Sequence, residues 1–143
     1  MKGVREPDAS ITKRACTVVP DDFGSRESEI VSHTVPDSLE CGEVRDVEVV
    51  VKNTGTAVWT RKDNFRLGTQ GDFNVLNPLT RFELPEDVEV KPGDTYTFSL
   101  QLFAPPVEYM ENAVGIRFDT TSAMVHEYVA WFGQGVSSSI AIT

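Results

Sequence analysis

The chain has 143 residues, the length of one ordinary domain, and 40% of them are hydrophobic, which is enough for a core and too many for global disorder. Its 22 Asp and Glu residues against 13 Lys and Arg residues leave a formal net charge of −9. This balance argues against nucleic-acid and anionic-membrane binding, because both require clustered basic side chains. The apolar stretches are only a few residues long, so we expect no membrane insertion.

The first 28 residues form a distinct segment. They carry five basic and five acidic residues among Pro, Gly and small polar residues, and only residues 15–19 favour a short strand. We therefore predict an N-terminal arm or linker over 1–28 and one domain over 29–143. The eight basic and seventeen acidic residues of that domain account for the whole net charge. Such acidity usually keeps a surface soluble, and a cationic partner is the alternative interpretation.

From Glu29 onward, apolar and polar residues alternate at period two, as in strands with one buried and one wet face. Val47, Val49 and Val51 share one face of such a run. No window of 11 residues shows a convincing helical period. The predicted strands are 29–34, 45–53, 57–61, 64–68, 80–84, 95–103, 113–119, 124–132 and 135–142. The sequence therefore predicts an all-β fold, an antiparallel β-sandwich of seven to nine strands.

Turn residues separate these runs. Asn53 and Gly55 break the strand that begins near residue 45. In the segment 91–94 (KPGD), Pro92 fixes φ at the second position and Gly93 can take positive φ at the third, which predicts a type II turn. Phe132 is followed by Gly133, a pattern that predicts a bulge or a close backbone approach. The residues that we expect in the core are Trp59, Phe98, Leu100, Ile116, Phe118 and Phe132.

Five short motifs occur in a fixed order. They are 51–60 (VKNTGTAVWT), 65–68 (FRLG) with 81–85 (RFELP), 90–94 (VKPGD), 104–105 (AP) and 131–133 (WFG). In order and spacing they resemble the immunoglobulin-like (Ig-like) domain found in the centre of the "next to BRCA" autophagy receptors, which has relatives in bacterial secreted and surface proteins. The resemblance covers about residues 29–142 and implies an Ig-like β-sandwich.

This chain departs from the receptor version of that domain. Of the four tryptophans for which the receptor version is noted, it keeps only Trp59, and Val49, Ile116 and Val136 occupy the other three positions. Trp131 precedes Phe132 and Gly133 as in the bacterial relatives. The resemblance therefore implies the fold and a bacterial, secreted or surface setting, but not the autophagy-receptor role.

Catalytic and metal-binding motifs are not found. His126 and Glu127 begin like a zinc helix motif, but residue 130 is Ala where the second His would stand. His33 is the other histidine, and a pairing of His33 with His126 stays an open alternative. The acidic residues near 83–89 favour a solvated edge, with calcium binding as a minor alternative. We expect no enzyme activity, no bound metal and no cofactor.

The two cysteines allow two interpretations. If the chain is exported, Cys16 and Cys41 could form a disulfide that ties the arm to the domain across 24 residues, which is worth roughly 3 kcal/mol in the loop-entropy model. If the chain is cytosolic, both thiols stay reduced.

The leading hypothesis is a non-catalytic Ig-like module for protein interaction or adhesion, or an accessory domain, with contacts made by loops or by an exposed sheet edge. We expect Phe73, Tyr109 and Met110 to lie in contact loops. The alternatives are a carbohydrate-binding accessory domain of a secreted enzyme and a self-assembling structural subunit. A secreted or surface location is favoured, the partner is a protein or a polysaccharide, and the oligomeric state is open.

Overall fold

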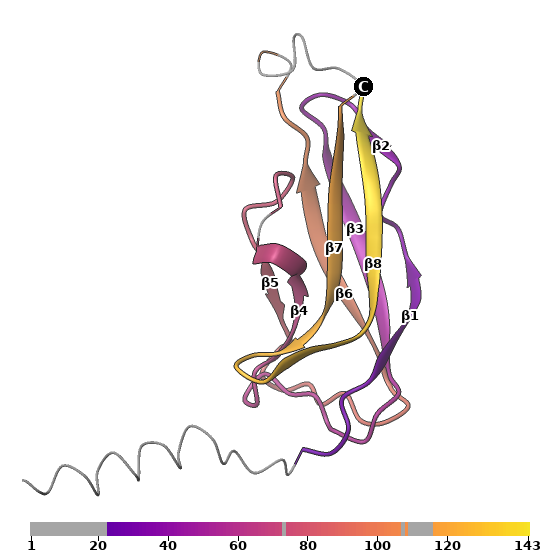
Figure 1. Cartoon of the computed structure of the whole chain (residues 1–143), viewed down its shortest axis with the longest axis vertical. Helices are drawn as coiled ribbons and strands as arrows, with labels where there is room; N and C mark the ends of the chain where they lie inside the picture. Colours follow the sequence, from indigo (N-terminus) through magenta and orange to yellow (C-terminus); the bar gives the residue numbers. More distant parts are fainter. Residues whose placement is uncertain (1–22, 73, 107, 109–115) are drawn as a thin grey trace, which may run out of the picture.

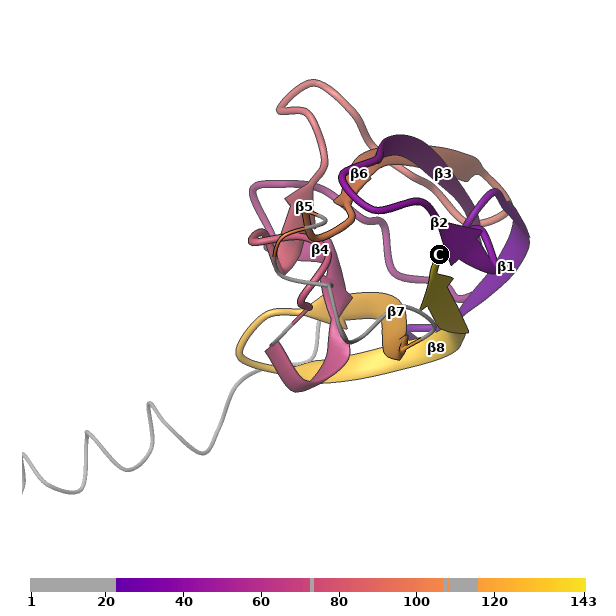
Figure 2. The ribbon, with the colours of Figure 1, turned by 90° about the horizontal axis from the view of Figure 1, so that it is seen from above.

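The computed structural model describes residues 23–72, 74–106, 108 and 116–143, which form two β-sheets packed face to face (Figures 1 and 2). The described elements are β1 (Ser28–His33), β2 (Ser38–Leu39), β3 (Val44–Asn53), β4 (Phe65–Thr69), the 3-10 turn η1 (Gln70–Asp72), β5 (Arg81–Glu83), β6 (Thr95–Phe103), β7 (Arg117–His126) and β8 (Ala130–Ile142). One sheet has the order β1-β3-β6 and the other the order β2-β8-β7-β4-β5. All neighbours are antiparallel except β2 and β8, a parallel pair of two residues.

The core lies between the two sheets and follows the period-two pattern of the sequence. Val47, Val49 and Val51 of β3 are buried and face Ile140 and Ile142 of β8, which are also buried. Strand β6 places Phe98 and Leu102 in the same layer, and Leu100 is packed at its margin. Each such side chain removed from water contributes about 1.5–3 kcal/mol, so this alternation provides the main driving force for the fold.

Aromatic rings form a row of successive contacts at one end of the sandwich. The ring of Phe132 lies edge-on to Trp59, with centroids 5.8 Å apart, and edge-on to Phe65 at 6.1 Å. Phe65 stacks on His126 at 4.1 Å with an interplanar angle of 14°, and Phe23 meets the edge of His126 at 4.7 Å. These contacts join β4, β7, β8 and the segment before β1.

Residues 23–27, which we call the strap, pack onto the domain. The carbonyl of Ser25 accepts hydrogen bonds from the backbone N–H groups of Thr56 (3.1 Å) and Ala57 (2.9 Å), and the carbonyl of Glu27 accepts one from Thr54 (3.1 Å). A Cβ atom at Gly55 would collide with the Ser25 carbonyl. The Asn53–Gly55 turn therefore serves as the docking site of the strap, and Gly is required there by close approach.

A bulge closes one side of the sandwich. Residues 133–135 of β8 lie opposite the single residue Ala123, because Phe132 pairs with Met124 and Val136 with Ser122. The Gln134 side chain accepts a hydrogen bond from the Ile30 N–H of β1 at 2.9 Å. Gly133 has a φ of 76° and packs so tightly on Ser28 that no Cβ would fit. The predicted close approach at Gly133 is confirmed.

The strand prediction was wrong at the C-terminal end. The three runs predicted over 113–119, 124–132 and 135–142 form only two long strands, β7 and β8, joined by a turn at residues 127–129. That turn contains no Gly, Pro or Asn, so the sequence pattern runs through it without interruption. The predicted strand 57–61 is also absent as a strand, since only Trp59 bridges to Val90.

The predicted core residues are placed as follows. Trp59 is fully buried and Phe98 nearly so, and Leu100, Phe118 and Phe132 are partly buried against the core. The prediction for Ile116 was wrong, because it precedes β7 and 46% of its surface is exposed. Its backbone carbonyl still accepts a hydrogen bond from the Ile142 N–H at 3.0 Å, so the position holds a strand end rather than the core.

Asn53 is a buried polar hub. Its Nδ2 donates to the carbonyls of Ala57 (2.7 Å) and Val90 (2.9 Å), and its Oδ1 accepts from the Gly55 N–H (3.0 Å). The Gly93 N–H donates to the Asn53 carbonyl at 2.7 Å, and Gly93 has the positive φ (89°) that the predicted turn requires. One side chain thus ties the end of β3 to two turns.

We expect Asn53→Ala to lower the free energy of unfolding by about 2–4 kcal/mol, because the buried Ala57 carbonyl and Gly55 N–H lose their partner and the Val90 carbonyl keeps only the Trp59 N–H. Urea denaturation measures the change. Thr54→Ala at the exposed neighbouring position is the control and should alter stability by less than about 0.5 kcal/mol. Equal stabilities of the two variants would contradict the assigned role of Asn53.

The predicted pairing of Cys16 with Cys41 involves one residue outside the described part, since the description begins at residue 23. Phe23 packs on His126, which pairs with Ala130 at the start of β8, whereas the Cys41 N–H donates to the Thr143 carbonyl beyond its end. The 13 residues of β8 span about 40 Å. Seven residues of fully extended chain between positions 16 and 23 reach at most about 25 Å. While the strap stays docked, we therefore expect no bridge within one chain, and the pairing of Cys16 with Cys41 stays an untested prediction.

We predict that peptide mapping of the oxidised protein without reduction finds no Cys16–Cys41 link within one chain. Any disulfide should instead join two copies and migrate as a dimer on a non-reducing gel. A monomer carrying the intrachain link would mean that the strap leaves the Asn53–Gly55 turn.

Candidate functional site: an aromatic hairpin tip

The turn between β7 and β8 presents three large apolar side chains to solvent. Tyr128 is 97% exposed, Val129 is 45% exposed and Trp131 is 37% exposed. We call Tyr128, Val129 and Trp131 the aromatic tip. In Figure 1 the hairpin projects at the end of the sandwich opposite the C-terminus. Single exposed apolar residues are ordinary, but three within four positions form an exposed apolar group.

The backbone at the tip is strained. The Val129 N–H donates to the His126 carbonyl at 3.0 Å and closes a four-residue turn. Tyr128 occupies the third position of that turn with a φ of 68°, where Gly or Asn is usual. The left-handed region costs a non-Gly residue roughly 1–2 kcal/mol. A bulky aromatic is therefore held where its own backbone disfavours it and where it packs on almost nothing.

A ladder of ion pairs fixes the base of the hairpin. Glu127 Oε2 accepts from Arg81 Nε at 2.7 Å and from Arg66 Nη1 at 3.1 Å. Glu83 in turn pairs with Arg66 at 3.5 Å and with Arg61 at 2.6 Å. The Glu127–Arg66–Arg81 side chains are only 17–24% exposed, so these bonds are less screened than ordinary surface pairs. Glu83 of the expected acidic edge is 38% exposed and forms these pairs at the surface.

Trp131 lies across the outer face of the five-stranded sheet. Its ring reaches Gly68 on β4, where an added Cβ would sit 2.9 Å from the indole. The Arg81 guanidinium lies over the ring at 4.9 Å from its centroid, within the range of a cation–π contact. Gly68 and Arg81 thus hold the indole in one position.

The two histidines lie on different sheets. His126 is buried (3% exposed), and its Nδ1 accepts a hydrogen bond from Arg26 Nε of the strap at 2.9 Å. His33 ends β1, is exposed, and its Nδ1 accepts from the Val35 N–H at 3.2 Å. His126 thus anchors the strap beneath the aromatic tip. In the part of the chain that the structure describes, no group of three His, Cys, Asp or Glu residues could hold a metal ion.

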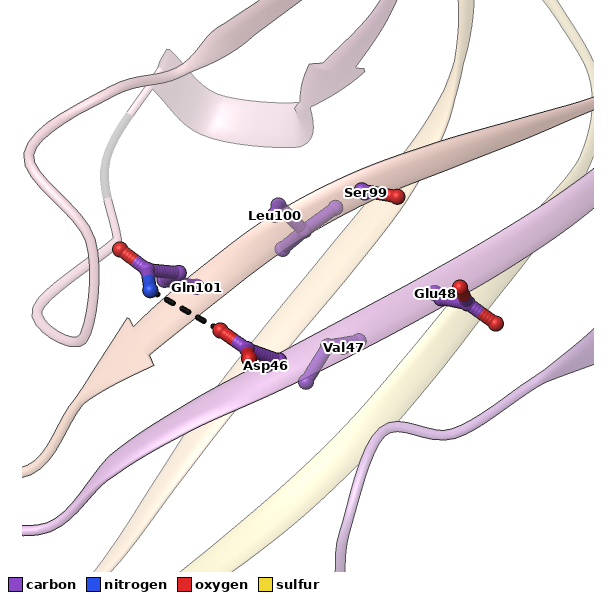
Figure 3. A pocket seen from close by; sticks show the side chains of 6 residues that line it. All are labelled: Asp46, Val47, Glu48, Ser99, Leu100 and Gln101. Atoms are coloured by element: carbon purple, nitrogen blue, oxygen red, sulfur yellow. Dashed lines mark hydrogen bonds between the residues drawn. The ribbon is translucent and has the colours of Figure 1, made fainter.

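A second surface lies on the outer face of the three-stranded sheet. A shallow hollow between β3 and β6 is lined by Asp46, Val47, Glu48, Ser99, Leu100 and Gln101 (Figure 3). Gln101 Nε2 donates to Asp46 Oδ1 at 2.9 Å across its floor. Around the edge of β6, a second hollow is lined by Asn77, Pro78, Leu79, Phe82, Ser99, Leu100, Gln101 and Phe103.

The predicted contact residues are not those of the aromatic tip. Phe73, Tyr109 and Met110 lie outside the described residues. The sequence prediction missed Tyr128 because residues 124–132 looked like one strand, in which Tyr128 would be one residue of an alternating run. The signal available in the sequence was the run Tyr-Val-Ala-Trp at 128–131, whose apolar residues do not alternate with polar ones.

Comparisons with known proteins bear on the fold. No family model matches the sequence, and no curated protein matches it. Among solved structures, a CARDB domain from Pyrococcus furiosus is 13% identical and covers 85% of this chain and 96% of its own, with a TM-score of 0.51. The predicted Ig-like β-sandwich is therefore confirmed.

Other solved structures match less well. A β-glucosidase from Listeria innocua in complex with glucose is 17% identical over 83% of this chain, with a TM-score of 0.38, and this chain spans only 16% of its length. AvmM, described as catalysing macrocyclization in alchivemycin A biosynthesis, is 12% identical over 85% of this chain and 89% of its own, with a TM-score of 0.41.

The described residues contain no helix long and apolar enough to cross a membrane.

We predict that Tyr128→Asn leaves stability unchanged or raises it by up to about 1 kcal/mol, because Asn tolerates positive φ. Trp131→Ala should lower stability by about 1–2 kcal/mol, through lost packing on Gly68 and Arg81. Urea denaturation of both variants measures the difference. A Tyr128→Asn variant that is clearly less stable than the wild type would show that Tyr128 has a structural role.

Proposed function

We propose that this chain is a non-catalytic Ig-like recognition module whose aromatic tip binds a protein partner. The observation that carries the proposal is Tyr128, which is almost wholly exposed and held at a positive φ. An exposed side chain with a strained backbone contributes little to folding, and strained backbone conformations cluster at functional sites. Tyr and Trp are also the residues that most often dominate the energy of protein interfaces.

The ion-pair ladder supports this assignment because it preorganises the tip. Glu127 is part of the turn itself, and its bonds to Arg66 and Arg81 connect that turn to β4 and β5. A rigid hairpin loses little conformational freedom on binding, which favours affinity. The tip also lies at the end of the sandwich opposite the C-terminus (Figure 1).

A polysaccharide ligand is the second candidate, favoured by the exposed indole of Trp131. The position of Arg81 counts against it, because the guanidinium already covers a face of that ring. Sugar stacking requires an open aromatic face, whereas a protein partner can use the indole edge, Val129 and the Tyr128 phenol together. We therefore place a protein partner first.

The family and the setting are part of the same proposal. The five motifs resemble the central Ig-like domain of the "next to BRCA" receptors, and Trp59, the one tryptophan that this chain keeps of the four in the receptor version, is fully buried in the core. We infer a bacterial, secreted or surface protein in which this domain has an accessory or adhesive role, without bound cofactor.

Photocrosslinking tests the proposal. A photoreactive phenylalanine at position 128 should give one defined protein adduct in cells of the source organism. The same residue at Val31, which is 53% exposed on β1, is the matched control and should give none. Titration of the purified adduct partner should then show that Tyr128→Ala weakens binding by about thirtyfold, a loss of about 2 kcal/mol.

Polysaccharide pull-down separates the two candidates. Retention of the chain on insoluble cellulose, chitin or xylan that is lost in Trp131→Ala would establish a polysaccharide ligand in place of a protein partner. Equal adducts at positions 128 and 31 would overturn the assignment of the tip.

A further inference from the structure

The four outer edges of the two sheets differ in how they are protected. Natural proteins blunt sheet edges by shortness, bulges, Pro or charge. Strand β1 carries a register shift between Ile30 and Ser32, β2 has two residues and β5 has three. Strand β6 has nine residues and pairs with β3 in unbroken register from Thr95 to Phe103. It is the one long, regular edge in the described part of the chain.

The sequence of β6 gives it no protection either. The run TYTFSLQLF contains no charged residue, no Pro and no Gly. Its residues favour strands, and an uncharged strand of this kind at an open edge is a pairing site for another strand. The opposite side of the sandwich needs no such partner, because the bulge of β8 joins it to β1.

The outward backbone groups of β6 have hydrogen-bond partners only in its C-terminal half. The Phe103 N–H donates to the Leu76 carbonyl at 2.7 Å, and the Gln101 carbonyl accepts from Asn77 Nδ2 at 2.6 Å. Both groups point away from β3, so the alternation of a strand directs the N–H and C=O groups of Thr97 and Ser99 outward as well. Neither residue has a further hydrogen bond among those that the described residues form outside the β3–β6 ladder.

Two surfaces of opposite character lie at the C-terminal end of this open segment, where both are lined by Ser99. On the core side, the second hollow offers Leu79, Phe82 and Leu100. On the outer side, the hollow in Figure 3 offers the carboxylates of Asp46 and Glu48, and the small Ser99 lies between Glu48 and the edge. A strand added to β6 would direct alternate side chains to these two surfaces.

We propose that the open edge of β6, at residues 95–99, binds an extended segment in which cationic and apolar residues alternate. The apolar side chains enter the hollow beside Leu100 and Phe82. The cationic side chains cross Ser99 toward Glu48 and Asp46. Main-chain hydrogen bonds to Thr97 and Ser99 supply affinity, and the two hollows supply specificity.

The charges around the edge define where the cations bind. Lys52 of β3 lies opposite Thr95, and Glu29 of β1 lies opposite Lys52 in the β1–β3 ladder. The uncompensated carboxylates therefore lie toward Ser99 and Gln101 rather than toward Thr95. A second copy of the chain is a poorer occupant, because each copy carries a net charge of −9 and its β6 offers no cation. This inference concerns the three-stranded sheet and is independent of the aromatic tip.

The test uses an acetylated and amidated peptide of alternating Lys and Val, three residues of each, with a Glu-for-Lys peptide as the matched control. NMR titration of the full chain should show amide shifts at residues 95–99 with the Lys peptide alone. Binding should weaken as salt rises, because screening acts on the exposed carboxylates. Sedimentation velocity on the same samples reports whether the chain pairs with itself.

Two substitutions locate the site. Ser99→Pro removes the outward N–H without disturbing the ladder to β3 and should lower the affinity for the Lys peptide by about fivefold or more. Ser99→Ala keeps that N–H and should bind the peptide as the wild type does. Glu48→Gln should reduce both affinity and salt dependence. Absence of binding, equal binding of the Glu peptide, shifts confined to the hairpin tip, or a dimer that Ser99→Pro dissolves would each overturn the proposal.

Discussion

The stack of Phe65 on His126 joins the parts of this molecule that carry its candidate function. His126 ends β7, and its carbonyl closes the turn that carries Tyr128, while its Nδ1 accepts from Arg26 of the strap. Phe65 begins β4 and contacts Phe132, which in turn contacts Trp59 in the core. Because His126 is buried among rings, the position of the hairpin is set by core packing rather than by the turn's own preference. The tip can therefore keep a strained tyrosine.

The two surfaces of interest have different physical origins. The aromatic tip exists because ion pairs and an aromatic stack hold a short turn in a conformation that its residues disfavour. The open edge of β6 exists because a two-sheet sandwich always leaves edges, and here only one side is closed by a bulge. The conformation of the tip depends on the ion pairs of Arg66 and Arg81 with Glu127. The charge beside the β6 edge comes from Asp46 and Glu48. A change at one should leave the other intact.

Particular residues show why much of the fold was predictable. Val47, Val49 and Val51 share the buried face of β3, since successive side chains of a strand point to opposite faces, and β3 and β6 lie within a residue of their expected limits. Local chemistry also identified the turns at Asn53 and Gly93. Prediction was wrong where a turn lacked turn residues, at 127–129, and where an apolar residue ended outside the core, at Ile116. In both places, long-range pairing of β7 with β8 overrides the local pattern.

The sequence by itself determined the class of fold, because period-two burial and turn chemistry are local properties of the chain. Only the tertiary structure decided the candidate sites. Tyr128 and Trp131 form one surface because Glu127, beside them, bonds to Arg66 and Arg81. These arginines lie 61 and 46 positions before Glu127 in the sequence. Ser99 lies at an open edge because no strand formed by the described residues lies beyond β6 in its sheet. Phe23 and Cys41 lie at opposite ends of β8, a distance that their spacing in sequence does not reveal. Such facts depend on which strands become neighbours, and that is settled by packing across the whole core.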